Sequence, residues 1–138
     1  AEVPEDLRPV FRALGRLPFK QMYNALERTH FLLALLDSRA ASLRRYLHHN
    51  TTGTRQLSLG FHTPMVMDRA FADAYGLDSA TALIHGPGRL QDGIEAARRL
   101  NPAAYARMRD ALRQLKSDIR ATSLANLEAH LNAQDGWA

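Results

Sequence analysis

The densest group of residues capable of chemistry in this 138-residue chain lies near its middle. It combines cationic, amide and hydroxyl side chains at Arg44, Arg45, His48, His49, Asn50, Thr51, Thr52, Thr54 and Arg55. Guanidinium groups bind carboxylate or phosphate in a bidentate manner, and turns of backbone amides offer further donors to an anion. We therefore expect the segment 50–64 and the turn 86–89 to form a pocket for an acidic ligand. The residues predicted to bind it are Arg45, His49, Asn50, Thr52, Arg55, His62 and Arg89.

The same cations also have a purely structural interpretation. Positive side chains stabilise the negative C-terminal end of a helix, and four of these residues would lie at such an end. Gly53 belongs to no phosphate-loop motif, because the second glycine and the Lys-Ser/Thr pair of that motif are missing. Composition and spacing leave both interpretations open.

The six histidines raise the alternative of a metal or haem protein. A zinc pair on a helix needs two ligands three or four residues apart, and no two histidines here have that spacing. A site would have to be assembled from distant positions, for which the candidates are His30, His49, His62 and His85. His30 falls between Leu26 and Leu33 in an apolar pattern, where a core histidine and an axial haem ligand look alike. The first choice is no cofactor, with haem or a transition metal as the alternative.

No catalytic motif stands out, so the sequence favours a non-enzymatic binding or regulatory module. Asp68 and Asp73 are five residues apart, about 140° around a helix, and do not face each other. A further alternative is nucleic-acid binding, because the chain carries a net charge of +4 and its cations are nearly all arginine. The arginines of the last helix are interrupted by Asp110 and Asp118, which favours a protein or a small acidic ligand as the partner.

Hydrophobic spacing predicts the elements that would position these residues. Apolar residues three, four or seven apart indicate two long helices, at about 18–49 and 102–131. Shorter helices are expected at 3–17, 64–75, 79–85 and 90–100, and an ordered irregular loop at 50–63. The predicted fold is therefore an all-α, single-domain bundle of five or six helices, spanning 1–138 with the two long helices antiparallel.

Composition gives some indication of the compartment and the oligomeric state of the protein. Cysteine is absent, which favours a cytoplasmic location without excluding export, since the chain starts at Ala1 and could be a processed form or a fragment. No apolar run approaches the roughly 18 residues of a membrane span. The arginine- and alanine-rich composition is typical of a GC-rich, bacterial-like genome. Leu32, Leu35 and Met67 fall off the main seams and indicate either core completion or a homodimer surface.

Overall fold

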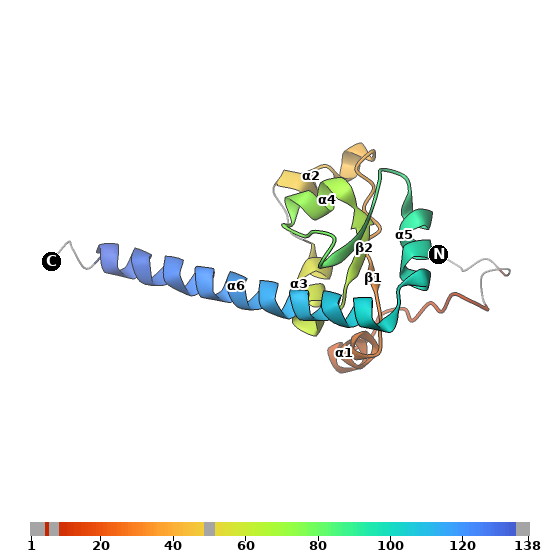
Figure 1. The fold of residues 1–138 in the computed structure, drawn as a ribbon, viewed down its shortest axis with the longest axis horizontal. Helices are drawn as coiled ribbons and strands as arrows, with labels where there is room; N and C mark the ends of the chain where they lie inside the picture. Colours follow the sequence, from red (N-terminus) through yellow and green to blue (C-terminus); the bar gives the residue numbers. More distant parts are fainter. Residues whose placement is uncertain (1–4, 6–8, 49–51, 135–138) are drawn as a thin grey trace.

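The computed structural model describes residues 5, 9–48 and 52–134, and it contains a parallel β-sheet flanked by helices (Figure 1). The prediction of an all-α bundle is therefore wrong. In chain order the elements are α1 (Phe19–Glu27), β1 (Leu32–Leu33), the 3-10 helix η2 (Ala41–Leu43), α2 (Arg45–His48), α3 (Gly53–Phe61), β2 (Met65–Asp68), α4 (Arg69–Ala74), β3 (Ala82–His85), α5 (Leu90–Arg99) and α6 (Pro102–Gln134).

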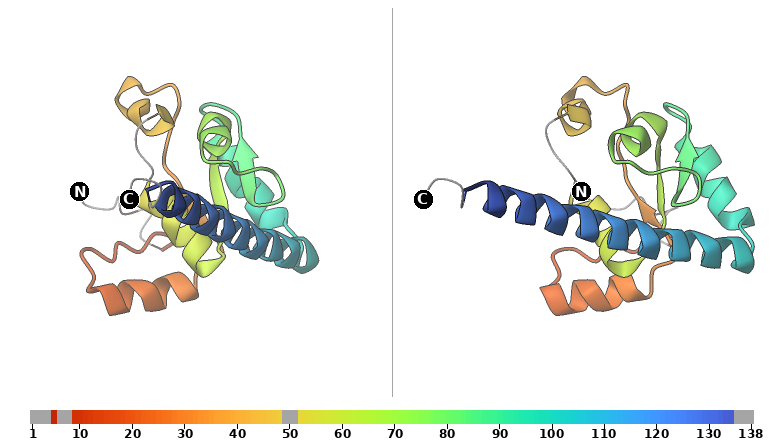
Figure 2. Two further views of the ribbon diagram at one scale, coloured as in Figure 1. Left: turned by 90° about the vertical axis from the view of Figure 1, so that its left-hand side faces the viewer. Right: turned by 60° about the vertical axis from the view of Figure 1, so that its left-hand side comes forward.

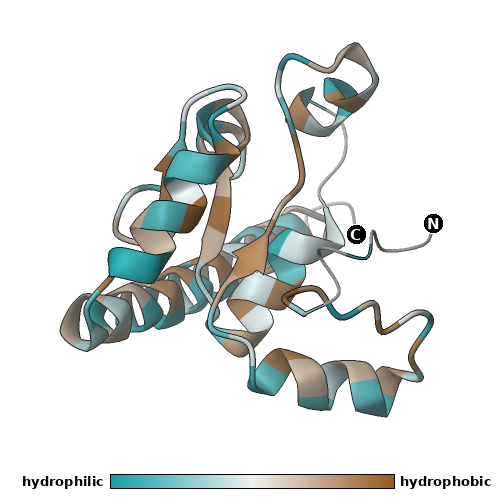
Figure 3. Cartoon of the chain, turned by 90° about the vertical axis from the view of Figure 1, so that its right-hand side faces the viewer, coloured by the Kyte–Doolittle hydropathy of each residue, from teal (hydrophilic) through white to brown (hydrophobic). Residues whose placement is uncertain are grey.

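The sheet has the strand order β1-β2-β3, and both pairs of strands are parallel. Leu32 lies opposite Met65, and Met65 lies opposite Ala82. All four residues of β2 are buried, since this strand has a neighbour on each side and helices over its faces. Figure 3 shows the strands as the most hydrophobic part of the interior, with banded helices around them. Because the strands are parallel, all three end at the same edge of the sheet.

Helices cover both faces of the sheet. Helix α5 lies against β2 and β3 on one side, and α4 lies on the other (Figure 1). The core contains Met65, Met67, Phe71 and Ala72, all fully buried. Gly93 allows α5 to approach closely, because a Cβ at that position would lie 2.6 Å from Cγ1 of Val66.

The predicted long helix at 18–49 is replaced by three short helices and a strand. The first of these helices, α1, ends at Glu27, and the chain enters β1 directly after His30 and Phe31; η2 and α2 follow as short helices of three and four residues. The reason is the run Phe31 to Leu36, which is apolar at nearly every position. A short continuous apolar run of this kind fits a strand of a parallel sheet as well as a helical spacing, so periodicity alone does not distinguish the two.

Four further predictions need correction. The expected irregular loop at 50–63 contains helix α3; Leu57 and Leu59, with a polar residue between them, fit a strand-like alternation as well as a short helix. The expected helix 64–75 begins as strand β2 before α4, and the expected helix 79–85 ends as β3. The described part of 3–17 holds only a single 3-10 residue and turns, not a helix.

The predictions for the last two helices are confirmed. Helix α5 occupies 90–99, and α6 begins at Pro102 after Asn101, whose side chain accepts a hydrogen bond of 2.8 Å from the amide of Ala104. Figure 2 shows α6 crossing the body and continuing well beyond it. Among the described helices, α6 included, none is both long and apolar enough to cross a membrane.

Replacing Gly93 by alanine tests the close approach of α5 to the sheet. The added methyl group would collide with Val66 and approach Cδ2 of His85 to 3.1 Å, so we expect a loss of about 1–3 kcal/mol in the free energy of unfolding. Urea denaturation followed by circular dichroism measures this loss.

Gly60→Ala is the matched control, because a Cβ on this exposed residue of α3 would meet no atom within 4 Å. It should raise stability by about 0.5–1 kcal/mol, as alanine usually does inside a helix. Equal effects of the two substitutions would show that α5 does not sit this close to β2.

Candidate functional site

A crevice of about 250 Å³ lies at the edge of the sheet where the parallel strands end. Its walls come from the segment that follows β1, from the last residue of β3 and from the turn before α5: Ala34, Leu35, Leu36, Asp37, Arg39, His85, Gly88 and Leu90. In open sheets of parallel strands, ligands bind in a crevice at this edge. The crevice is therefore where the fold itself favours a binding site.

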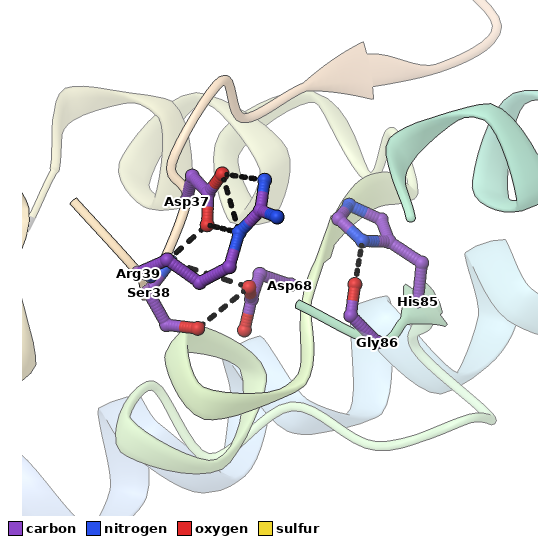
Figure 4. A network of polar contacts seen from close by, with 6 residues as sticks. All are labelled: Asp37, Ser38, Arg39, Asp68, His85 and Gly86. Atoms are coloured by element: carbon purple, nitrogen blue, oxygen red, sulfur yellow. Dashed lines mark hydrogen bonds and ion pairs between the residues drawn. The ribbon is translucent and has the colours of Figure 1, made fainter. Parts of the chain in front are cut away.

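Asp68 fixes the geometry beneath the crevice. It is the last residue of β2 and is completely buried. One carboxyl oxygen accepts hydrogen bonds from the amide and the hydroxyl of Ser38, at 3.2 and 2.8 Å (Figure 4). The other accepts a hydrogen bond of 2.9 Å from the amide of Ala70 and so caps helix α4. One side chain thereby ties the end of β2 to α4 and to the segment after β1.

Asp37 and Arg39 form an ion pair at the mouth of the crevice. The Arg39 side chain donates from Nε and Nη2 to the carboxylate, with the shortest distance 2.7 Å (Figure 4). These hydrogen bonds, and one from the backbone amide of Arg39, lower the pKa of Asp37 to about 2. The same pairing raises the pKa of Arg39. Asp37 is therefore a permanent hydrogen-bond acceptor at neutral pH, and its side chain is 39% exposed.

One ring nitrogen of His85 is buried and has no hydrogen-bond partner among the described residues. Its Nδ1 atom lies 2.8 Å from the carbonyl oxygen of Gly86 (Figure 4). Because a carbonyl oxygen can only accept, Nδ1 of the neutral ring carries the proton and Nε2 has a free lone pair. The residue is only 6% exposed, and Nε2 makes no hydrogen bond within the described part of the chain. A buried polar atom without a partner is costly unless a bound molecule satisfies it.

The turn after β3 brings backbone close to the crevice. Gly88 has a φ of +69°, and a Cβ there would collide with the guanidinium group of Arg39. Helix α5 starts two residues later, and the side chain of its N-cap residue, Arg89, makes no capping hydrogen bond within the described ranges. The first amide groups of a helix are hydrogen-bond donors with positive partial charge. Leu90, the first residue of α5, lines the crevice, and the same first turn also contains the acidic Asp92.

The structure does not gather the residues predicted to bind an anion. Arg45 lies on α2 against the ring of Tyr46, and Arg55 donates from Nε to the carbonyl oxygen of Tyr75. Thr52 precedes α3, and its buried hydroxyl has no partner among the described residues. Of the remaining predicted residues, His49 and Asn50 lie outside the described residues.

The other two predicted anion-binding residues, Arg89 and His62, lie near opposite ends of the strands. Arg89 belongs to the turn beside the crevice, where it forms an exposed ion pair with Asp92 at 2.8 Å. His62 ends α3 with a φ of 53° and lies just before β2, at the edge where the strands begin. Its carbonyl oxygen accepts a hydrogen bond of 3.3 Å from Nε of Arg109. Of the predicted set, Arg89 is thus the residue nearest in sequence to the crevice lining.

The histidines proposed as metal or haem ligands are also separated. His30 lies before β1, with its ring 6.0 Å from that of Tyr105, whereas His85 lies at the end of β3. Within the described ranges, no three histidine, aspartate or glutamate side chains come together in a way that could hold a metal ion.

Sequence reasoning missed four residues of the site region: Asp37, Ser38, Arg39 and Asp68 as members of one network. A usable signal was present, because Asp37 and Asp68 each follow directly after an apolar run. If both runs are interpreted as parallel strands, their polar ends must meet at one edge of the sheet.

Comparison with known proteins adds no further constraint. No protein-family model matches this chain, and neither a curated protein nor a solved structure shows significant similarity to it. The function must therefore be argued from the geometry of the site.

Substitution of Asp68 by asparagine tests the network beneath the crevice. The amide nitrogen that replaces one oxygen cannot accept a hydrogen bond, so a backbone amide or the Ser38 hydroxyl loses its acceptor. We expect the free energy of unfolding to fall by about 1.5–3 kcal/mol. Asp73→Asn, at an exposed position of the adjoining α4, is the control and should change stability by less than about 0.5 kcal/mol. An equally small effect at Asp68 would contradict the account.

His62 predicts a pH dependence of stability. Burial, and then the positive charges of Lys116, Arg113 and Arg109, lower the pKa of His62 below 6.5. The unfolded chain therefore takes up a proton at a pH where the native chain does not, and native stability falls as pH decreases through about 6.5. Urea denaturation between about pH 7.5 and 5.5 should show this fall. His62→Asn, which tolerates the left-handed backbone, should reduce the slope, and an unchanged slope would contradict the assignment.

Proposed function

We propose that this chain is a binding module for a small polyhydroxylated ligand with an acidic group, held in the crevice at the carboxyl edge of the sheet. The observation that carries the proposal is Nε2 of His85, which is buried, lacks a hydrogen-bond partner in the part of the chain that the structure describes and belongs to a residue of the crevice wall. The proposal keeps the binding function and the 86–89 turn predicted from sequence, and it replaces the segment 50–64 by the residues that follow β1.

Two acceptors support hydroxyl groups on the ligand. Nε2 of His85 offers a lone pair, and the carboxylate of Asp37 stays ionised because its pKa is about 2. Both groups accept hydrogen bonds and so prefer a ligand with O–H donors. Arg39 already makes four hydrogen bonds to Asp37, but its Nε group is shared between both carboxylate oxygens, so three donor groups occupy about four acceptor positions and leave about one for a hydroxyl.

Donors near the same crevice support an acidic group. The N-terminus of α5 lacks a side-chain cap, and Nη1 of Arg39 makes no hydrogen bond within the described residues. Uncapped helix amides together with a guanidinium group favour phosphate or carboxylate. Acceptors and donors thus occur in one crevice, which matches a ligand that carries both hydroxyls and an anion.

The size and walls of the crevice set the scale of the ligand. A volume of about 250 Å³ lies just below the range usual for drug-sized ligands, so it suits a molecule such as a sugar phosphate. Leu35, Leu36 and Leu90 supply apolar surface against which a sugar ring can pack.

Isothermal titration calorimetry with three probes tests the proposal: glucose 1-phosphate, glucose and inorganic phosphate. We expect the sugar phosphate to bind more tightly than either fragment, because it alone satisfies both the acceptors and the donors. Absence of heat and of chemical-shift changes with all three probes at millimolar concentration would contradict it.

His85→Asn identifies the atom responsible. The asparagine amide can still donate to the carbonyl oxygen of Gly86 in place of Nδ1, but it has no atom at the position of Nε2. We expect affinity for glucose 1-phosphate to fall about tenfold, the effect of losing one hydrogen bond to a polar ligand. His62→Asn makes the same chemical change at the opposite edge of the sheet and should leave affinity unchanged. Equal affinities for all three proteins would exclude His85 from binding.

A further inference from the structure

The second half of helix α6 presents an apolar stripe that nothing in the described chain covers. Every residue over 120–133 is exposed, and Leu124, Leu127 and Leu131 are 49%, 53% and 52% exposed. Figure 1 and Figure 2 both show this half of α6 projecting from the body. The spacings of three and four residues place the three leucines on one helical face, as in a two-heptad coiled-coil seam.

The first half of α6 behaves differently. Met108 is 5% exposed and Leu112 is completely buried, and Lys116 donates to the carbonyl oxygen of Gly60 at 3.4 Å. The contacts of α6 with the body therefore end shortly after Lys116. Helical segments of about 15 residues gain most of their stability from packing of an apolar face, so a partner on the leucine stripe would stabilise the projecting half.

We propose that the projecting half of α6 pairs with the same segment of a second copy, in antiparallel orientation about a two-fold axis at Leu124. The antiparallel orientation is argued from two charged residues beside the leucine stripe. Arg120 lies four residues before Leu124 and Glu128 lies four residues after it. An antiparallel pair centred on Leu124 brings Arg120 of each copy beside Glu128 of the other.

Neither charge is already engaged in a pair within the described part of the chain: its ion pairs involve other residues. A parallel pair in register would instead place like charges beside each other, which is destabilising. Exposed charge pairs at an interface select orientation more than they add affinity.

The same register also places side chains of complementary size opposite each other in the two helices. Leu124 meets its own copy at the axis, and Leu127 lies opposite Ala121, a large side chain against a small one. Leu131 lies opposite Ser117, close to where α6 leaves the body. Alternation of large and small residues lets two helices interdigitate. This inference does not depend on the crevice or on its ligand.

Sedimentation velocity of the whole chain between about 5 and 500 µM tests the pairing. This concentration range suits the weak association expected of a small interface. We expect a reversible shift from monomer to dimer. Leu124→Lys should abolish the dimer, whereas Asn126→Lys adds the same charge on the opposite face of α6 and should leave it intact. A wild-type chain that stays monomeric throughout, or a dimer that survives Leu124→Lys, would overturn the proposal.

Charge exchange tests the orientation. Arg120→Glu and Glu128→Arg should each weaken the dimer at least about fivefold, because each places like charges together in both symmetry-related pairs. The double variant restores opposite charges and should recover wild-type association. Failure of the double variant to recover, with helical content unchanged by circular dichroism, would overturn the antiparallel arrangement.

Discussion

The buried carboxyl group of Asp68 is the contact on which the arrangement of the site depends. It ends the fully buried strand β2, caps α4 through the amide of Ala70 and accepts both donors of Ser38. Together with the hydrogen bond of 3.1 Å from the amide of Ala34 to the carbonyl oxygen of Val66, these bonds tie the segment after β1 to the central strand. Asp37 and Arg39 flank Ser38, so their position at the mouth of the crevice follows from the anchoring of that one residue.

A second constraint comes from the opposite wall. Gly93 lets α5 lie close to Val66, and the turn containing Gly88 then passes directly beside the guanidinium group of Arg39. The N-terminus of α5 and the ring of His85 are thereby held on one side of the crevice, and the Asp37–Arg39 pair on the other (Figure 4). The crevice is built from close packing and buried hydrogen bonds, which is what a preorganised binding site requires.

The sequence predicted the helices that have an amphipathic pattern and missed the strands that do not. Helix α6 was located because cap, proline and spacing agree at Asn101 to Pro102, and α5 because a helical pattern follows the turn 86–89. Strands β1, β2 and β3 were interpreted as helix because their short apolar runs also fit a helical spacing. The same ambiguity concealed the site. His85 and Arg89 were selected for their chemistry, but Asp37 and Asp68 gain their meaning only as the ends of parallel strands, which a helical interpretation removes.

The most direct test of the central claim is the protonation of the His85 ring, measured by long-range proton–nitrogen correlation NMR at mildly alkaline pH with and without glucose 1-phosphate. His85→Asn assigns the signals. The account predicts a neutral ring with its proton on Nδ1, donated to Gly86, and an Nε2 resonance that shifts when the sugar phosphate is added. A proton on Nε2 in the free protein, or an Nε2 resonance that does not respond to the ligand, would contradict it.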